Sequence, residues 1–322
     1  MLSIIYVNYF CVDFLLQSID SLYQYELSMP HEIIVVNNSP EDKNLIKLSA
    51  KYPQVKLIET GYNAGFARAN NAGIKIANGN IILLLNADTY VTDNSIDLLY
   101  DDFSYSDFGA CVPQLYSTDG AKQLSAFHVP VGGLNTLLPF PIIGTIIKSI
   151  GNLFSVNIHS TPNNNEIVDA DWVHGACLMF KKEIINSVGL LDEDFFLYSE
   201  EIEWCGRIRK KYKIGLFSKY KVIHLEGQSS NQLFNNGAKG YYDVYSKKGL
   251  QLMLSSLVRI RKEFGIFWFL FHLTVYCVEV PLLFTYKIFN RQIQPVSLAK
   301  NVFYLIKKAN IIIRNRPYFY KV

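Results

Sequence analysis

The sequence predicts an α/β fold, with a mostly parallel sheet flanked by helices and a helical, apolar and basic segment at the C-terminus. Short apolar runs alternate with helical patterns in the first part of the chain, which is typical of a parallel sheet. The run Ile81–Leu85 is uncharged and too short for a typical helix, as expected of a strand buried on both faces. After about residue 230 the pattern changes to long apolar stretches, which indicates a second, helical region.

Four strands are expected before residue 86, each followed by polar or turn-forming residues. Their bounds are Leu2–Val7, Glu32–Val36, Val55–Glu59 and Ile81–Leu85. Helical patterns separate these strands: one contains Leu15, Ile19 and Leu22, a short one covers Lys43–Lys51, and a third opens within Gly61–Gly73. A helix between each pair of strands favours crossover connections, so we predict helices on both faces of the sheet.

Further along the chain the elements become less regular. An amphipathic helix is expected around Ile96–Phe103, and strands are expected over Gly109–Leu115 and Asp171–Phe180. Residues 127–169 lack periodicity and include several Pro and Gly residues. Because a long irregular insertion in a compact domain is usually a functional loop, we predict a flexible flap there, on the acceptor side of the site.

The charge of the chain is unevenly distributed. The formal net charge is +3, but residues 280–322 contain eight basic residues and no acidic ones, which leaves −5 for the first 279 residues. The basic residues are Lys287, Arg291, Lys300, Lys307, Lys308, Arg314, Arg316 and Lys321. No nucleic-acid-binding motif accompanies them, so this basic tail favours an anionic membrane surface over nucleic acid as its partner.

Cysteine usage and the N-terminus both favour a cytoplasmic protein. The five cysteines are scattered and include no C-x-x-C pair, which predicts buried, reduced thiols. The chain starts directly with a strand and has no basic region followed by a cleavage site, so we do not expect a signal peptide.

Asn86 and Asp88 follow the buried strand Ile81–Leu85 with a single residue between them. Ligands of open α/β sheets bind at the carboxyl ends of the strands. A carboxylate and an amide at such an edge suit a hard divalent cation that holds phosphates. The alternative is a polar turn in which Asp88 caps the next helix.

The Gly61–Gly73 loop offers small residues where a backbone can approach a ligand, and it precedes a helix N-terminus that favours anions. Arg68 lies within reach of a phosphate at this position. The loop does not match the dinucleotide-binding pattern, and the alternative is a tight turn needed only for packing.

Two further groups of residues are candidates for chemistry. Glu200, Glu201 and Glu203 begin a helix, and one of these carboxylates is a candidate general base. Acidic residues in a first helical turn are also favoured by the helix dipole, which is the structural alternative. His224 follows a short strand and is a candidate metal ligand, although a single histidine is more often structural.

The C-terminal region is predicted to be helical over Gly240–Lys262 and almost entirely apolar over Phe264–Phe289. Glu279 and Pro281 interrupt this apolar stretch, and ionisable groups inside a membrane span cost about 2.5–3.5 kcal/mol each on insertion scales. We therefore expect helices that lie on the membrane or pack on the domain, not a true span.

The motifs taken together resemble those of glycosyltransferase family 2, and most closely its rhamnosyltransferase-like branch of bacterial surface-glycan synthesis. The resemblance covers about residues 1–230 and leaves the C-terminal segment unidentified. The motifs, in order, are Ser3-Ile-Ile-Tyr-Val-Asn-Tyr9, Val35-Val-Asn-Asn-Ser39, Asn63-Ala-Gly-Phe-Ala-Arg-Ala-Asn-Asn71, Leu84-Leu-Asn-Ala-Asp-Thr89, Asp171-Trp-Val-His-Gly-Ala-Cys177, Leu191-Asp-Glu-Asp-Phe-Phe-Leu-Tyr-Ser-Glu-Glu201 and Val222-Ile-His224.

This resemblance implies a GT-A type, Rossmann-like fold, a nucleotide-sugar donor, a Mg²⁺ or Mn²⁺ ion and inversion at the anomeric carbon. It assigns Glu201 as catalytic base, beside Glu200, and Asp88 with His224 to the metal. The residues expected at the nucleotide, the diphosphate and the sugar are Val7, Asn8, Asn37, Asn63, Arg68, Asn86, Asp88 and Trp172. Asn37 stands where the family often has Asp, and Asn86 where it has the first Asp of D-x-D.

The predicted protein is therefore a metal-dependent inverting glycosyltransferase with a transferase domain over 1–230 and a membrane-associating segment over 231–322. The expected donor is dTDP-rhamnose or a UDP-sugar, and the acceptor a glycan on a polyprenyl-diphosphate lipid. We expect a cytoplasmic protein, peripheral at the inner face of the cell membrane. The alternatives are a catalytically silent scaffold of the same fold and a nucleotidyltransferase, although the first strand lacks the Gly-rich basic loop of the latter.

Overall fold

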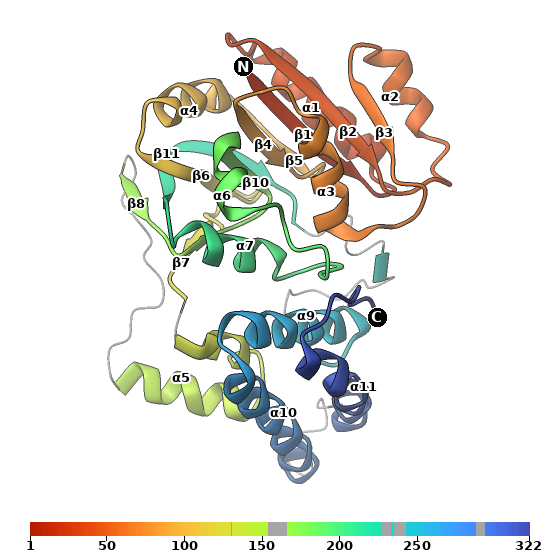
Figure 1. Cartoon of the computed structure of the whole chain (residues 1–322), viewed down its shortest axis with the longest axis vertical. Coiled ribbons are helices and arrows are strands. Elements are labelled where there is room, and N and C mark those ends of the chain that lie inside the picture. Colours follow the sequence, from red (N-terminus) through yellow and green to blue (C-terminus); the bar gives the residue numbers. More distant parts are fainter. Residues whose placement is uncertain (130, 154–165, 227–232, 235–242, 288–293) are drawn as a thin grey trace. The chain divides into compact units, whose positions relative to one another are not determined.

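A computed structural model of the chain describes residues 1–129, 131–153, 166–226, 233–234, 243–287 and 294–322 (Figure 1). The chain folds into two compact units. The first comprises Met1–His128, His159–Glu193 and Glu201–Leu233. The second comprises Val129–Ile158, Asp194–Glu200 and Phe234–Val322.

The first unit is built on a sheet of nine strands among the described residues, in the order β3-β2-β1-β4-β10-β6-β11-β5 with β8 beside β11 (Figure 1). The strands are β1 (Leu2–Asn8), β2 (His31–Asn37), β3 (Lys56–Glu59), β4 (Ile81–Leu85), β5 (Thr89–Tyr90), β6 (Phe108–Tyr116), β8 (Ile167–Asp169), β10 (Cys177–Lys181) and β11 (Lys213–His224). The pairs β1–β2, β2–β3, β1–β4 and β6–β11 are parallel. Strand β10 runs antiparallel between β4 and β6. The predicted mostly parallel sheet is confirmed.

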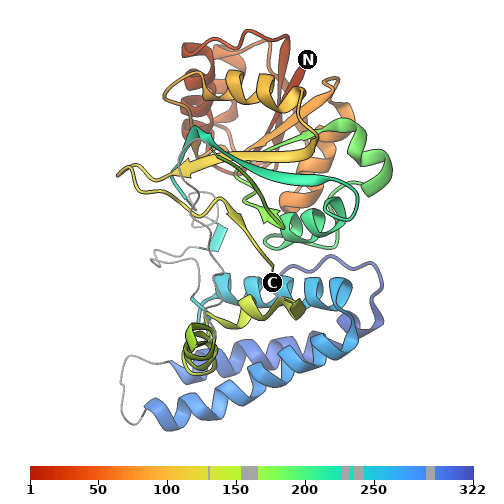
Figure 2. The ribbon, with the colours of Figure 1, turned by 90° about the vertical axis from the view of Figure 1, so that its left-hand side faces the viewer.

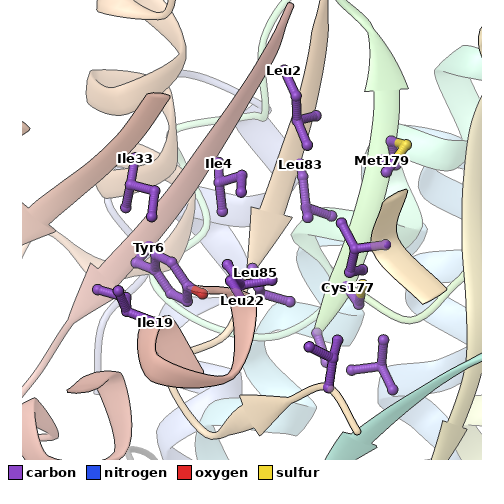
Figure 3. Close-up of a cluster of buried hydrophobic side chains, with 14 of the residues drawn as sticks. Leu2, Ile4, Tyr6, Ile19, Leu22, Ile33, Leu83, Leu85, Cys177 and Met179 are labelled. Atoms are coloured by element: carbon purple, nitrogen blue, oxygen red, sulfur yellow. The ribbon is translucent and has the colours of Figure 1, made fainter. Parts of the chain in front are cut away.

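Helices cover both faces of this sheet, as predicted. Leu2, Ile4 and Tyr6 of β1 point to the face that holds α1 (Val12–Gln24), where they pack in one buried cluster with Ile19 (Figure 3). Successive strand residues point to opposite faces. Ile5 accordingly lies against α3 (Gly65–Ile76), where a Cβ added at Gly73 would come within 2.5 Å of the Ile5 side chain. This glycine therefore lets α3 pack closely on the sheet.

The same buried cluster extends across β4 and β10. Leu83, Leu85, Cys177 and Met179 point to the α1 face of the sheet (Figure 3). The helices α2 (Leu45–Lys51) and α4 (Ser95–Ser104) also contribute buried side chains to this cluster. The cysteines at 11, 111, 177 and 205 are buried, Cys277 is half-buried, and none of the five is in a disulfide. The predicted burial of the thiols is thus confirmed for the first four.

Two predicted elements differ from the structure. The expected strand over Asp171–Phe180 is split into β9 (Trp172–Val173) and β10, and β9 pairs with β7 (Ala126–Phe127) in a separate small sheet. The expected irregular insertion over 127–169 is partly helical. Its described residues contain a 3-10 helix, η1 (Val131–Leu137), and the helix α5 (Ile143–Leu153).

The second unit is helical. Its long helices α9 (Lys247–Glu263), α10 (Ile266–Lys287) and α11 (Pro295–Arg314) pack on one another (Figure 2). They share a buried cluster with side chains of η1, including Leu137. Residues 288 and 289 of the predicted apolar stretch, and 240–242 of the predicted helix before it, lie outside the described residues.

Pro281 does not interrupt α10, contrary to the sequence prediction. Helix α10 continues from Ile266 to Lys287 with Pro281 inside it. Pro281 lies on the exposed side, while Leu283 beyond it is fully buried in the cluster. Burial on both sides of the proline offsets the hydrogen bond that it removes. Among the described residues, α10 is the one helix long and apolar enough to cross a membrane.

The predicted boundary between domains also differs from the division seen in the structure. Asp194–Glu200 falls with the helical unit because the C-terminal residues hold it. The backbone N–H of Tyr320 donates to Asp194 O (2.8 Å), and Lys262 Nζ lies 2.6 Å from Asp194 Oδ2. Ser255 Oγ donates to Leu197 O (2.8 Å). Residues 129–153 fall with the same unit.

Glu279 explains why α5 belongs to the helical unit. Its buried carboxylate accepts hydrogen bonds from the backbone N–H groups of Ile142 (2.7 Å) and Ile143 (2.9 Å), at the start of α5. The first N–H groups of a helix have no partner within the helix, and a negative charge there is favoured by the helix dipole. Glu279 therefore caps α5 from α10.

We expect Glu279→Leu to lower the free energy of unfolding of the helical unit by about 2–4 kcal/mol, since two backbone donors lose their acceptor. Glu279→Gln keeps one acceptor oxygen and should cost about half as much. Thr274→Leu, at an exposed position of the same helix, is the matched control and should have little effect. Thermal unfolding followed by circular dichroism measures all three. If the Glu279→Leu and Thr274→Leu variants unfold at the same temperature, the Glu279 cap contributes nothing to the stability of the helical unit.

Candidate functional site

The predicted site residues of the first unit gather at one edge of the sheet. Strands β1 and β2 are parallel and in register, so that Asn8 pairs with Asn37 at their carboxyl ends. Strand β4 is parallel to β1 and ends there too, and antiparallel β10 begins opposite Leu85, with Cys177 as its partner. Ligands bind at the carboxyl ends of strands in open α/β sheets. The topology therefore brings these polar strand ends together.

Asn8 and Asn37 form a buried polar cluster at this edge. Asn8 Nδ2 donates to Asn37 Oδ1 (3.1 Å), and its Oδ1 accepts from Cys11 N (3.2 Å). Asn37 Nδ2 donates to Glu59 Oε2 (2.8 Å) at the end of β3. Val7 precedes Asn8 and is half-buried. The amides are held rigidly, and Glu59 adds a carboxylate at the position where Asn37 replaces an expected aspartate.

The loop before α3 is fixed by a second asparagine pair. Asn38 Nδ2 donates to Asn63 Oδ1 (3.3 Å), and Asn38 Oδ1 accepts from Ala64 N (2.7 Å). Arg68, in the first turn of α3, donates through Nε to Glu193 O (2.9 Å) and through Nη1 to Tyr62 OH (3.4 Å). Arg68 is half-buried, and these two hydrogen bonds orient its guanidinium near the helix N-terminus, a position that suits an anion.

Asp88 and His224 face each other in the same site. His224 is the last residue of β11, and its Nε2 lies 3.6 Å from Asp88 Oδ1; both side chains are almost fully buried. Strand β5 pairs with β11 at this point, and Leu225 N donates to Asp88 O (2.9 Å). Asn86, predicted to lie at the diphosphate, donates its backbone N–H to Ala176 O (2.9 Å) and is half-buried.

The orientation of the His224 ring fits a metal ligand. Gln123 Nε2 donates to His224 O (2.8 Å), so its Oε1 accepts the proton on His224 Nδ1 (2.9 Å). Burial lowers the pKa of His224 to about 4, so the ring is neutral at pH 7. The Nε2 lone pair therefore points at a carboxylate, and a hydrogen bond that fixes the other ring nitrogen is typical of metal-bound histidine.

The donor set of Asp88 and His224 suits a divalent cation held partly by substrate. Two ligand atoms that each lie about 2.1 Å from one ion are about 3.0–3.6 Å from each other when the ligand–ion–ligand angle is about 90–120°. The distance between His224 Nε2 and Asp88 Oδ1 falls in this range. No cluster of three or more His, Cys, Asp or Glu side chains suited to an ion occurs in the part of the chain that the structure describes. Mg²⁺ commonly binds one or two protein groups together with phosphates and water.

His174 and Gly175 connect this pair to Glu201. The His174 ring centroid is 5.3 Å from that of His224, and burial lowers the pKa of His174 to about 3. A Cβ added at Gly175 would lie 3.5 Å from Glu201 Cβ, in the first turn of α7 (Glu200–Ile208). The predicted base thus lies beside the segment between β9 and β10, at the same edge as Asp88.

The other two glutamates of α7 differ from Glu201. Glu203 is bound by both Arg207 Nε and Nη2, at 2.8 Å each, in an ion pair along the helix. Glu200 is almost fully buried and falls with the helical unit. Of the three carboxylates, Glu203 therefore has a structural role, and Glu201 is the one placed beside Gly175.

Trp172 stacks on Phe127, with ring centroids 4.2 Å apart and planes 4° from parallel. The two residues are directly paired across β7 and β9. The indole Nε1–H of Trp172 is buried and has no acceptor among the described residues. A buried N–H donor of this kind is a candidate contact for a sugar hydroxyl, so the expected sugar-binding role of Trp172 stays a prediction.

Three residues of this site were missed from the sequence. His174 lies in a motif of which only Trp172 was predicted as a site residue. A histidine two residues after Trp172 could have been recognised as a further candidate. Gln123 and Glu59 had no such signal. Each acts through a partner distant in sequence, and Gln123 lies 101 residues from His224.

Known proteins that are similar to this chain are glycosyltransferases. Residues 3–187 match the family model described as Glycosyl transferase family 2. A hexosyltransferase of low-salt glycan biosynthesis from Haloferax volcanii, Agl10, is 29% identical over 228 residues, which span 69% of this chain and 66% of the relative. An N-acetylglucosaminyl-diphospho-decaprenol L-rhamnosyltransferase from Mycobacterium tuberculosis is 24% identical over 224 residues, 63% of this chain and 69% of that protein. The chain thus spans about two thirds of the length of these relatives.

A solved structure shares the fold. The crystal structure of GalNAc-T7 with UDP, GalNAc and Mn²⁺ superposes with a TM-score of 0.55 at 16% sequence identity. The match covers 81% of this chain and 48% of that protein. At this identity the similarity concerns the fold alone, a mixed, mostly parallel sheet with flanking helices.

Proposed function

Because the chain belongs to glycosyl transferase family 2, we propose that it transfers a sugar from a nucleotide-diphospho-sugar to a hydroxyl of a growing glycan, with inversion at the anomeric carbon. The observation that carries the proposal is the pair of Asp88 and His224 Nε2, 3.6 Å apart. Glu201 lies in the same unit, beside Gly175. A cation site and a carboxylate base at one sheet edge are what such a transfer requires.

The surroundings of several predicted residues support the roles proposed for them. The buried amides of Asn8 and Asn37, with Glu59, offer fixed donors and acceptors to a nucleoside. Arg68 is oriented at the N-terminus of α3 for a phosphate. Trp172, held by stacking on Phe127, offers a buried N–H donor to a sugar.

In the proposed reaction Glu201 accepts the proton of the acceptor hydroxyl as its oxygen attacks the anomeric carbon. The new C–O bond forms on the face opposite the diphosphate, whose bond to that carbon breaks. Arg68 stabilises the charge that develops on the leaving nucleoside diphosphate. A Mg²⁺ or Mn²⁺ ion held by Asp88 and His224, with Asn86 beside them, would supply further charge neutralisation at the diphosphate.

Donor and acceptor are proposed from the motifs and the relatives' names. dTDP-rhamnose is the first candidate, because the mycobacterial relative is named as a rhamnosyltransferase that acts on a decaprenyl-diphosphate-linked sugar. A UDP-hexose is the second, because the relative from Haloferax is named as a hexosyltransferase and the solved structure that shares the fold contains UDP. A polyprenyl-diphosphate-linked acceptor would place the protein at the cytoplasmic face of the cell membrane.

Thermal unfolding in the presence of dTDP, UDP or GDP, each with and without Mn²⁺, tests the proposal. A ligand that binds only the native state raises its stability by mass action. At about 100 times the dissociation constant, the gain is about 2.7 kcal/mol, or roughly 5–10 °C in Tm. We expect a shift that needs Mn²⁺ and is largest for one nucleotide, which identifies the donor class.

The main alternative is a catalytically silent scaffold with the same fold. It predicts no metal-dependent shift with any of the three nucleotides and no transfer of sugar. Membership of the family argues against the nucleotidyltransferase alternative.

A further inference from the structure

Helix α10 presents an uncharged apolar stripe to solvent. Phe267, Leu270, Phe271, Val278 and Leu282 are between 37% and 85% exposed. They recur every three, four or seven residues, so they share one face of the helix. The residues between them on this face, at 274, 281 and 285, are Thr, Pro and Thr. Soluble proteins rarely expose a continuous apolar surface of this kind without a partner.

Helix α11 continues this surface with apolar and basic side chains. Val296 and Phe303 are more than half exposed, and Lys300, Lys307 and Arg314 recur every seven residues beside them. Lys307 Nζ lies 4.4 Å from the centroid of the Phe303 ring, so charge and aromatic surface adjoin. Both helices pack on α9 and on each other (Figure 2).

The surface carries positive charge without negative charge. Beyond Glu263 the chain has one acidic residue, Glu279, and its carboxylate is buried at the start of α5. The basic residues of this part that the structure describes are Lys287, Lys300, Lys307, Lys308, Arg314, Arg316 and Lys321. Two copies of such a face would repel each other, whereas an anionic surface would attract it.

The opposite face of α10 argues against a span. His272 and Glu279 are fully buried there, where His272 Nε2 contacts Gly132 O at 2.9 Å and Glu279 caps α5. Helix α9 packs along α10 and carries five basic residues, namely Lys247, Lys248, Arg259, Arg261 and Lys262. Bringing α10 across a bilayer would place His272 and Glu279 in hydrocarbon without these hydrogen-bond partners, at high cost.

We propose that the exposed faces of α10 and α11 dock on a bilayer that contains anionic lipids, with both helices lying in the plane of its surface. The apolar stripe enters the acyl boundary, and the lysines and Arg314 meet the lipid phosphates. The inference deepens the membrane location proposed above. It does not depend on sugar transfer, so binding to vesicles and turnover can fail separately.

Co-sedimentation of the full chain with vesicles tests this proposal. Vesicles of phosphatidylcholine mixed with phosphatidylglycerol should bind the protein in a salt-sensitive way, and vesicles of phosphatidylcholine alone much less. Phe267→Ser with Phe271→Ser should weaken binding by about tenfold or more. Lys300→Gln, Lys307→Gln and Arg314→Gln together should weaken binding to the anionic vesicles by about 10–100-fold.

The matched control is Ile46→Ser with Tyr105→Ser, two exposed apolar residues of the first unit, which should bind like the wild type. Equal binding by all variants, with unchanged circular dichroism spectra, would overturn the proposal. Loss of self-association in the phenylalanine variant, with vesicle binding retained, would assign the face to a second copy instead. Protein that resists a carbonate wash of the vesicles would contradict the in-plane arrangement.

Discussion

Glu201→Gln is expected to lower kcat for sugar transfer by about 10²–10⁴-fold, the usual contribution of a general base. Glutamine keeps the size of the side chain and cannot accept the proton of the acceptor hydroxyl. Since Glu201 lies beside Gly175 and not in the asparagine cluster of Asn8 and Asn37, the KM for the donor and the nucleotide-induced rise in Tm should stay near wild-type values. Steady-state kinetics with the donor identified by thermal unfolding measures both parameters.

Two glutamates of the same helix serve as controls. Glu203→Gln removes a charge that Arg207 pairs, so it should cost stability and leave kcat close to that of the wild type. Glu200→Gln tests the residue that precedes Glu201 in the acidic pair of the family motif. If Glu200→Gln loses turnover while Glu201→Gln keeps it, the base has been assigned to the wrong residue. If neither loses turnover in an active protein, the base lies elsewhere.

Asp88→Asn is expected to abolish the metal-dependent stabilisation by nucleotide and to lower kcat by about 10²–10⁴-fold. The substitution keeps the shape of a side chain that is almost fully buried 3.6 Å from His224 Nε2, and removes its charge. A cation bound between an amide and a neutral imidazole has lost its anionic ligand. Binding of the nucleotide with and without Mn²⁺, followed by calorimetry, measures the loss directly.

Gln123→Ala tests the same metal site and should weaken it less than Asp88→Asn does. It removes the acceptor that fixes the proton on His224 Nδ1, and loss of such an outer partner typically weakens metal binding by about 10–100-fold. Asp93→Asn is the matched control, because the Asp93 carboxylate accepts from Ser95 N at the start of α4. Metal-dependent nucleotide binding that survives Asp88→Asn would place the ion at other residues.

The polar residues at the sheet edge were predictable because strands are encoded locally. Apolar runs such as Ile81–Leu85 fix where a buried strand ends, and parallel pairing then brings Asn8, Asn37 and Asp88 to one edge. The bounds of β4 agree with the prediction, those of β1 differ by one residue at one end, and those of β2 differ by one residue at each end. Local periodicity contains this information because a strand or helix must bury one face or both.

The helical unit was less predictable for a physical reason. The sequence showed that α10 is apolar but not which face is covered, and so Glu279 was taken as an interruption when it is the cap of α5. Helix α5 and Asp194–Glu200 belong to the helical unit, although the transferase sequence surrounds them, because of such contacts between distant residues. Pairs more than 100 residues apart leave no periodic signal in either partner.

By itself, the sequence determined the fold class, the family and the order of polar residues along the strand ends. The fold class and the polar strand ends follow from the local spacing of apolar and polar side chains, and the family follows from the resemblance of the motifs. The tertiary structure decided which carboxylate of α7 lies beside Gly175, which nitrogen of His224 faces Asp88, and which stripe of α10 meets solvent. These features depend on hydrogen bonds and packing between elements that only folding brings together.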